Sequence, residues 1–159
     1  MALFEKDIAE IQLKIQGVLG KRAWGVARSD IATFVTLEFG PPQPPKRPHG
    51  KSHGEWHLWI YGGAWRVEKE GRVVVASDDE YTTSEMQVRC LEGRVLQSFE
   101  IMTPALDAVL TFEQEIILRI FSTYSEETEE TGMDTWKLYT PDKGKVIQIH
   151  AGGTWSYGL

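Results

Sequence analysis

The sequence predicts an α+β fold, a mainly antiparallel β sandwich or barrel built from two similar helix-plus-four-strand halves, with a helix at the N-terminus. Helical periodicity is confined to the first 18 residues and one short later segment. After Lys21, short runs rich in valine, isoleucine and aromatic residues alternate apolar and polar positions between glycine-containing turns. The order of elements also repeats at an interval of about 73 residues. We therefore predict a single domain over residues 1–159, with pseudo-repeats at about 4–80 and 82–155.

The first element is an amphipathic helix over residues 4–18. Its apolar residues are spaced by four and three positions and form one stripe: Phe4, Ile8, Ile11, Ile15 and Val18. Gly17 and Gly20 supply the stop. We expect this stripe to pack on a sheet, with a dimerisation helix as the alternative. The polar face has few basic residues, which disfavours membrane binding.

Strands follow at residues 34–39, 56–61, 65–68 and 73–76. The second of these is apolar or aromatic on both faces. One face carries Trp56, Leu58 and Ile60, and the other carries His57, Trp59 and Tyr61. One face therefore needs a cover, which could be the N-terminal helix, another subunit or a ligand.

The second half repeats this order. Residues 82–85 match a capping box that opens a short helix with Met86, Cys90 and Leu91 as its apolar residues. Strands are predicted at residues 110–112, 116–120, 136–139 and 146–149. Because each half alone would expose one apolar sheet face, we expect the two halves to bury these faces against each other.

Charge and cysteine content exclude several classes of protein. The formal charge is -6, and the excess of acidic residues lies wholly after residue 80. An acidic surface disfavours nucleic-acid binding and favours a basic partner. A single cysteine excludes a disulfide scaffold, and no apolar run is long enough to cross a membrane. With no signal peptide at the N-terminus, these features predict a cytoplasmic protein.

The halves differ most in two insertions. Residues 40–55 hold five of the seven prolines and predict a stiff exposed loop, with a polyproline docking motif at residues 41–48 as the alternative. Residues 122–134 contain an acidic run that predicts a solvated loop. The candidate contacts for a basic partner are Glu126, Glu127, Glu129 and Glu130.

Few residues suggest a catalytic or metal-binding role. His49, His53 and His57 are four residues apart, but the surrounding glycines and prolines exclude a helix, so we expect no common face and no metal site. Asp78 and Asp79 follow a predicted strand and are expected in a turn, with acid–base chemistry as the alternative. The chain has no phosphate loop, nucleophile elbow or zinc-protease motif. We therefore predict no catalytic residue and no cofactor.

From about Trp56 to Trp155 the motifs resemble those of small bacterial β-rich domains of unknown function. The residues that carry the resemblance are Trp65-Arg66-Val67-Glu68, Ser77-Asp78-Asp79, Leu91-x-Gly93-Arg94, Leu110-Thr111-Phe112, Leu118-Arg119-Ile120-Phe121, Trp136-x-Leu138-Tyr139 and Gly153-x-Trp155. Some similar domains are thought to act as immunity proteins beside toxins, so the resemblance implies binding and brings no catalytic residues.

These observations favour a non-enzymatic protein-binding module, such as an immunity or inhibitor protein for a basic partner. The alternative is a small-molecule-binding protein or an enzyme with a pocket near His57, Trp59, Tyr61 and Asp78. A homodimer formed through residues 56–61 or through the N-terminal helix is the third hypothesis.

Overall fold

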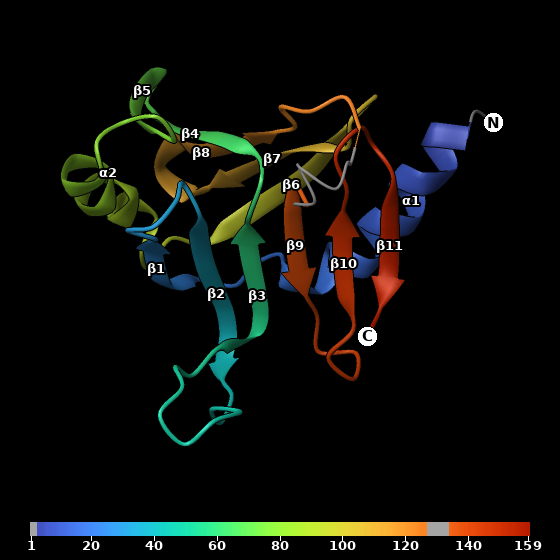
Figure 1. The fold of residues 1–159 in the computed structure, drawn as a ribbon, viewed down its shortest axis with the longest axis horizontal. Coiled ribbons are helices and arrows are strands. Elements are labelled where there is room, and N and C mark those ends of the chain that lie inside the picture. The colour runs from blue at the N-terminus through green and yellow to red at the C-terminus, as the bar shows by residue number, and fades with distance from the viewer. Residues whose placement is uncertain (1–2, 127–133) are drawn as a thin grey trace.

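The computed structural model describes residues 3–126 and 134–159, which form two helices and two antiparallel sheets (Figure 1). The first half contains α1 (Leu3–Ile15), η1 (Gln16–Val18), β1 (Ala23–Arg28), β2 (Val35–Pro42), β3 (Gly54–Ile60), β4 (Ala64–Lys69) and β5 (Arg72–Ala76). The second half contains α2 (Tyr81–Gln87), η2 (Val88–Leu91), β6 (Leu96–Met102), β7 (Asp107–Phe112), η3 (Glu113–Glu115), β8 (Ile116–Phe121), β9 (Trp136–Tyr139), β10 (Val146–Ile149) and β11 (Trp155–Gly158). The predicted α+β, mainly antiparallel sandwich is confirmed.

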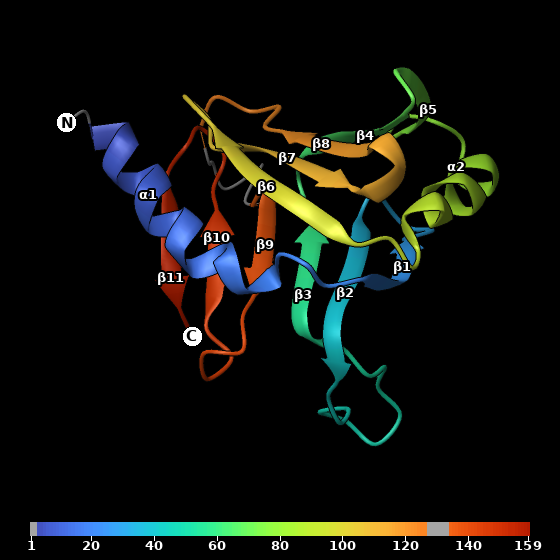
Figure 2. The same ribbon diagram turned by 180° about the vertical axis from the view of Figure 1, so that it is seen from behind.

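The strands form two sheets, and each sheet contains strands from both halves of the chain. One sheet has the order β1-β2-β3-β9-β10-β11, and the other has the order β5-β4-β8-β7-β6. Figure 2 shows α1 running along the inner side of the first sheet near β10 and β11, while α2 lies beside β1 and β5. Neither described helix has the length and apolar content needed to cross a bilayer.

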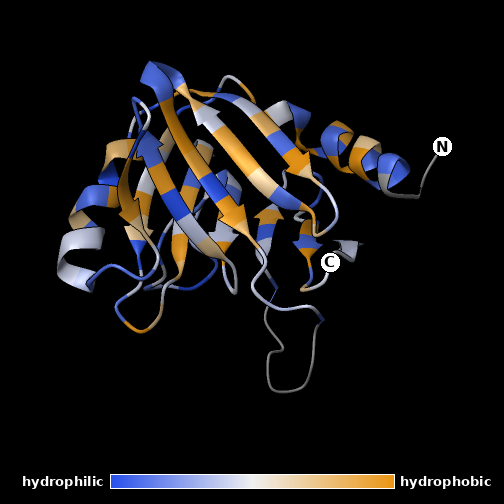
Figure 3. Cartoon of the chain, turned by 90° about the horizontal axis from the view of Figure 1, so that it is seen from above, coloured by the Kyte–Doolittle hydropathy of each residue, from blue (hydrophilic) through white to orange (hydrophobic). Residues whose placement is uncertain are grey.

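The core lies between the two sheets because each strand directs alternate side chains inward. Figure 3 shows this alternation of hydrophobic and hydrophilic residues along the strands. Val35, Leu37 and Phe39 of β2 are fully buried, and so are Ile11 and Val18 at the N-terminal helix. The predicted helical stripe is confirmed for the residues whose side chains are described.

The two halves have equivalent topologies. If β1 to β5 are matched with β6 to β10, the first five strands of one sheet have the same order as the five strands of the other. The two segments that precede β1 and β6 meet at a bridge between Arg22 and Val95. Their backbone hydrogen bonds come in matched pairs: the N–H of Gly20 donates to Leu96 O at 2.8 Å, and the N–H of Gly93 donates to Ala23 O at 2.7 Å. The fold therefore has pseudo-twofold symmetry, while its origin in a duplication stays a prediction.

The first half has five strands and the second has six rather than the predicted four each, because β1 and β6 were not anticipated and β11 follows the second set. Both strands carry an irregularity in pairing, between Trp24 and Ala27 in β1 and between Leu96 and Ser98 in β6. Such a bulge shifts the alternation of side chains, and this hides the strand periodicity.

The predicted capping box is also wrong. Helix α2 begins at Tyr81 after Glu80, and no side chain caps its N-terminus. Ser84 is buried and its hydroxyl donates to the carbonyl oxygen of Glu80 at 2.8 Å. Met86 is exposed, and Val88 and Leu91 supply the buried apolar side chains of this segment.

On the outer face of the five-stranded sheet, Glu68 accepts hydrogen bonds from Arg119 Nε at 2.6 Å and from Arg66 Nε at 2.9 Å. These two bonds, the one from Arg119 above all, lower the pKa of Glu68 below its ordinary value. The ion pair therefore stabilises the fold fully above the pKa of the unfolded chain, and this contribution is lost as the pH falls through the folded-state pKa.

We expect Glu68→Gln to lower the free energy of unfolding by about 0.2–1 kcal/mol at neutral pH, since the arginines are partly exposed to water. The difference from the wild type should shrink as the pH falls through the lowered folded-state pKa of Glu68, because the carboxylate is then protonated in both states. Urea unfolding at neutral pH and across a series of acidic pH values measures this, with Glu100→Gln on β6 as the control. An undiminished difference at acidic pH would contradict the assignment.

Candidate functional site

The outer face of the six-stranded sheet carries a row of polar and aromatic side chains. The strand register places Trp24, Glu38, His57 and Tyr139 next to one another across β1, β2, β3 and β9. In Figure 1 this face points toward the viewer, and no helix of the described chain lies over it. The predicted division of β3 into a core face and a second aromatic face is confirmed, but α1 does not cover the second face.

A buried carboxylate lies at the centre of this row. Glu38 Oε2 accepts a hydrogen bond from His57 Nδ1 at 2.6 Å, and Glu38 Oε1 accepts one from the backbone N–H of Gly54 at 2.8 Å. His53 Nδ1 lies 3.5 Å from Glu38 Oε1. The side chains of Glu38 and His57 are 5% and 10% exposed, whereas that of His53 is 53% exposed. Two imidazoles thus converge on one carboxylate that water hardly reaches.

This arrangement corrects one sequence expectation. His53 and His57 do share a face, with ring centroids 4.4 Å apart. His53 directly precedes β3 and His57 lies within it, and both imidazoles reach the carboxylate of Glu38. His49 lies farther out on the exposed loop and is not a member of this cluster.

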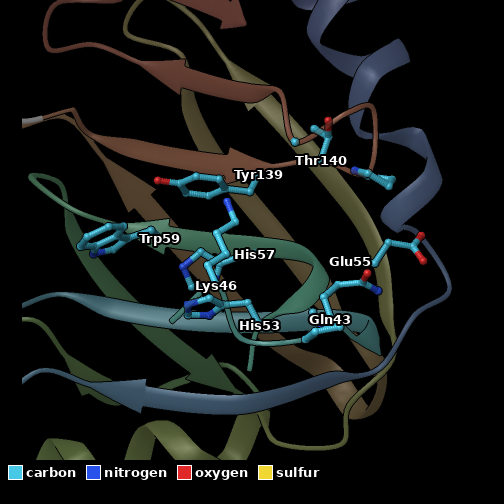
Figure 4. Close-up of a pocket in the computed structure, with 12 residues that line it drawn as sticks. Gln43, Lys46, His53, Glu55, His57, Trp59, Tyr139 and Thr140 are labelled. Carbon is cyan, nitrogen blue, oxygen red and sulfur yellow. The ribbon is translucent and has the colours of Figure 1, made fainter. Parts of the chain in front are cut away.

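His53 and His57 line a pocket with a volume of about 600 Å³. Its walls come from β3, from the β2–β3 loop (residues 43–53) and from the end of β9 with the turn that follows. The lining residues are Gln43, Pro44, Lys46, His53, Gly54, Glu55, His57, Trp59, Tyr139, Thr140, Pro141 and Gly144. Figure 4 shows the rings of Trp59, Tyr139, His57 and His53 at one end of the pocket and Gln43, Glu55 and Thr140 at the other.

A second carboxylate–histidine pair lies on the same sheet. Asp134 Oδ1 accepts a hydrogen bond from His150 Nδ1 at 2.6 Å, and Asp134 Oδ2 lies 3.4 Å from Lys137 Nζ. Lys137 in turn lies over the rings of Trp59 and Tyr61, at 5.8 and 5.1 Å from their centroids. Through Lys137, this second pair is linked to Trp59, which lines the pocket.

The equivalent position in the other sheet has no such chemistry. The topology matches the pair Glu38 and His57 with Thr111 and Ile117, which are likewise paired across neighbouring strands. The strands on either side of that second pair are joined by the short η3 rather than by residues 43–53. The fold therefore does not require a buried glutamate and histidine at this point of the sheet.

The residues predicted for a pocket are only partly brought together. His57 and Trp59 line it, and Tyr61 lies beyond Trp59, stacked on Phe34 with centroids 4.6 Å apart. Asp78 and Asp79 lie in the turn after β5, in the other sheet, where Asp79 Oδ2 accepts the backbone N–H of Ala76 at 2.9 Å. The predicted turn is confirmed, and neither aspartate is among the residues that line the pocket.

The acidic run cannot be placed in the same way. Glu126 is exposed, and Glu127, Glu129 and Glu130 lie outside the described residues. Binding of a basic partner at this run stays a prediction. Cys90 is half-buried and unpaired, and its burial raises the pKa of the thiol, which opposes a role as a nucleophile.

Sequence reasoning missed Glu38 and Tyr139. Both lie on the outer face of predicted strands, and a polar residue on a half-buried strand is usually solvated. The sequence offers one signal, which is that His57, Trp59 and Tyr61 place polar and aromatic groups on one strand face that other side chains must border.

No protein family, curated protein or solved structure matches this chain.

Proposed function

We propose that this protein binds a small molecule in the pocket between the β2–β3 loop and the β9–β10 turn. The observation that carries the proposal is a concave site lined by Trp59, Tyr139 and His57, the last of which is hydrogen-bonded to the buried Glu38. Its volume of about 600 Å³ falls within the range of ligand pockets, which combine apolar walls with a few fixed polar groups. The alternative function suggested by the sequence is thus favoured, at a site shifted away from Asp78.

The lining residues favour a ring-shaped ligand with hydrogen-bonding groups. Trp59 and Tyr139 offer faces on which a flat or sugar-like ring can stack. Lys46, Gln43 and Thr140 offer donors at the pocket rim. The β2–β3 loop supplies several of these groups, and its prolines limit the conformational entropy that is lost when a ligand is bound.

A ligand-observed NMR screen tests the proposal with a panel of monosaccharides, nucleosides and heteroaromatic carboxylic acids. We expect at least one class to bind, and we expect Trp59→Ala and Tyr139→Ala each to weaken its affinity by about tenfold, the effect of losing one stacking contact. Tyr124→Ala removes an exposed tyrosine elsewhere and is the matched control. Absence of any binder, or binders that are indifferent to both pocket variants, would overturn the proposal.

A further inference from the structure

We propose that Glu38, His53 and His57 form a binding site for a divalent transition-metal ion of the zinc type, open on one side to the pocket. Each residue offers one ligand atom, and these atoms all lie within 4.8 Å of one another. Two imidazoles and one carboxylate are a donor set that holds zinc while leaving a coordination position for a further ligand. The inference rests on these three side chains and does not require the proposed small molecule.

The distances are close to what a metal needs. Two ligand atoms bound at about 2.0–2.1 Å from one zinc ion lie about 3.3 Å apart at the tetrahedral angle. Oε2 of Glu38 lies 2.6 Å from His57 Nδ1, and Oε1 lies 3.5 Å from His53 Nδ1, so each histidine is near this distance from one of the two carboxylate oxygens. Because the three ligand atoms lie within 4.8 Å of one another, the side chains must move closer together to hold one ion.

The surroundings favour a cation as well. Glu38 is a buried carboxylate, and burial of a charge costs free energy unless it is compensated. The N–H of Gly54 donates to Oε1 and so orients the carboxylate, as outer partners of metal ligands commonly do. At the matching position of the other sheet, Thr111 pairs with Ile117, so the strands can pair there without a glutamate and a histidine.

Binding requires a change of tautomer at His57. In the structure His57 Nδ1 faces Glu38 Oε2 and donates the hydrogen bond between them. For a metal to bind at Nδ1, this nitrogen must be unprotonated, so the neutral imidazole carries its proton on Nε2 instead. Coordination by His53, which ends the loop, would also tie residues 43–53 to the sheet and shape the pocket.

Cobalt and zinc titrations of the chelator-treated protein test the site. We expect Co²⁺ to give a visible absorption band at one equivalent and Zn²⁺ to displace it. His53→Ala should weaken Zn²⁺ binding by about tenfold or more, and Glu38→Gln should do the same. His53 is half-exposed, so its variant tests the site even if a variant at a buried position fails to fold.

His49→Ala and His150→Gln are the matched controls, since each removes a histidine outside the cluster. We expect both to bind zinc like the wild type. No saturable binding, or equal loss in His49→Ala and His53→Ala, would overturn the proposal. Repeating the ligand screen with and without Zn²⁺ distinguishes the metal site from the small-molecule pocket. The protein can fail to bind zinc while the pocket still binds a small molecule, and it can bind zinc while the pocket binds none.

Discussion

Replacement of Trp136 by alanine is expected to lower the free energy of unfolding by about 3–5 kcal/mol, the usual cost of emptying a large aromatic site in a core. Trp136 is fully buried on β9, and its ring lies 5.4 Å from that of Phe99. Its indole N–H also donates to Leu106 O at 3.1 Å. The substitution therefore leaves a cavity and an unpaired carbonyl group where the two sheets meet.

The pseudo-twofold symmetry sharpens this expectation. Trp65 takes the matching place on β4, is 1% exposed, and donates its indole N–H to Thr33 O at 2.7 Å. Thr33 and Leu106 are themselves 73 residues apart, so the two tryptophans make the same contact in each half. Trp65→Ala should cost about as much as Trp136→Ala.

Urea unfolding of the two alanine variants measures the effect. Trp24→Ala, on the edge strand β1, is the control and should cost clearly less, because Trp24 is only partly buried. Trp136→Phe keeps most of the volume and lacks the N–H, so it provides a measurable variant if the alanine form does not fold. A loss below about 1 kcal/mol for both alanine variants would contradict the assigned core role.

Alternation of side chains explains why much of this fold could be predicted. In β2 and β3 every second residue is apolar, and the core faces of both strands follow directly from that period. In β1 the pattern fails because Gly25, with φ of 61°, and the adjacent irregularity break the two-residue period. A bulge is set by pairing with the neighbouring strand, which a local pattern does not contain.

The candidate site could be predicted only in part for a similar reason. His57 and Trp59 stand out locally, whereas Glu38 reaches them through the register of β2 on β3 across residues 43–53. Tyr139 arrives from the other half through the pairing of β3 with β9. Loop length and composition do not determine such registers when a long loop joins the strands.

The largest effect at the site itself is expected for Glu38→Leu, which should lower the free energy of unfolding by about 3–5 kcal/mol. The change leaves the Nδ1–H of buried His57 and the N–H of buried Gly54 without their acceptor. Glu38→Gln is the matched control. Its amide oxygen can still accept from Gly54 and its amino group can donate to the other tautomer of His57, so it should cost about 1 kcal/mol.

The double variant Glu38→Thr with His57→Ile copies the matched pair of the other sheet and separates a structural role from a functional one. Removal of both partners of a buried pair is far less costly than removal of one, so we expect the double variant to lie within about 2 kcal/mol of the wild type. Each single variant should cost more than the double, which a double-mutant cycle in urea would show. If the costs of the singles instead simply add, then Glu38 and His57 stabilise the fold independently, and the coupling expected between them is contradicted. Near-wild-type stability, together with loss of zinc and ligand binding, would mean that the molecule keeps a costly buried pair for what it binds rather than for its fold.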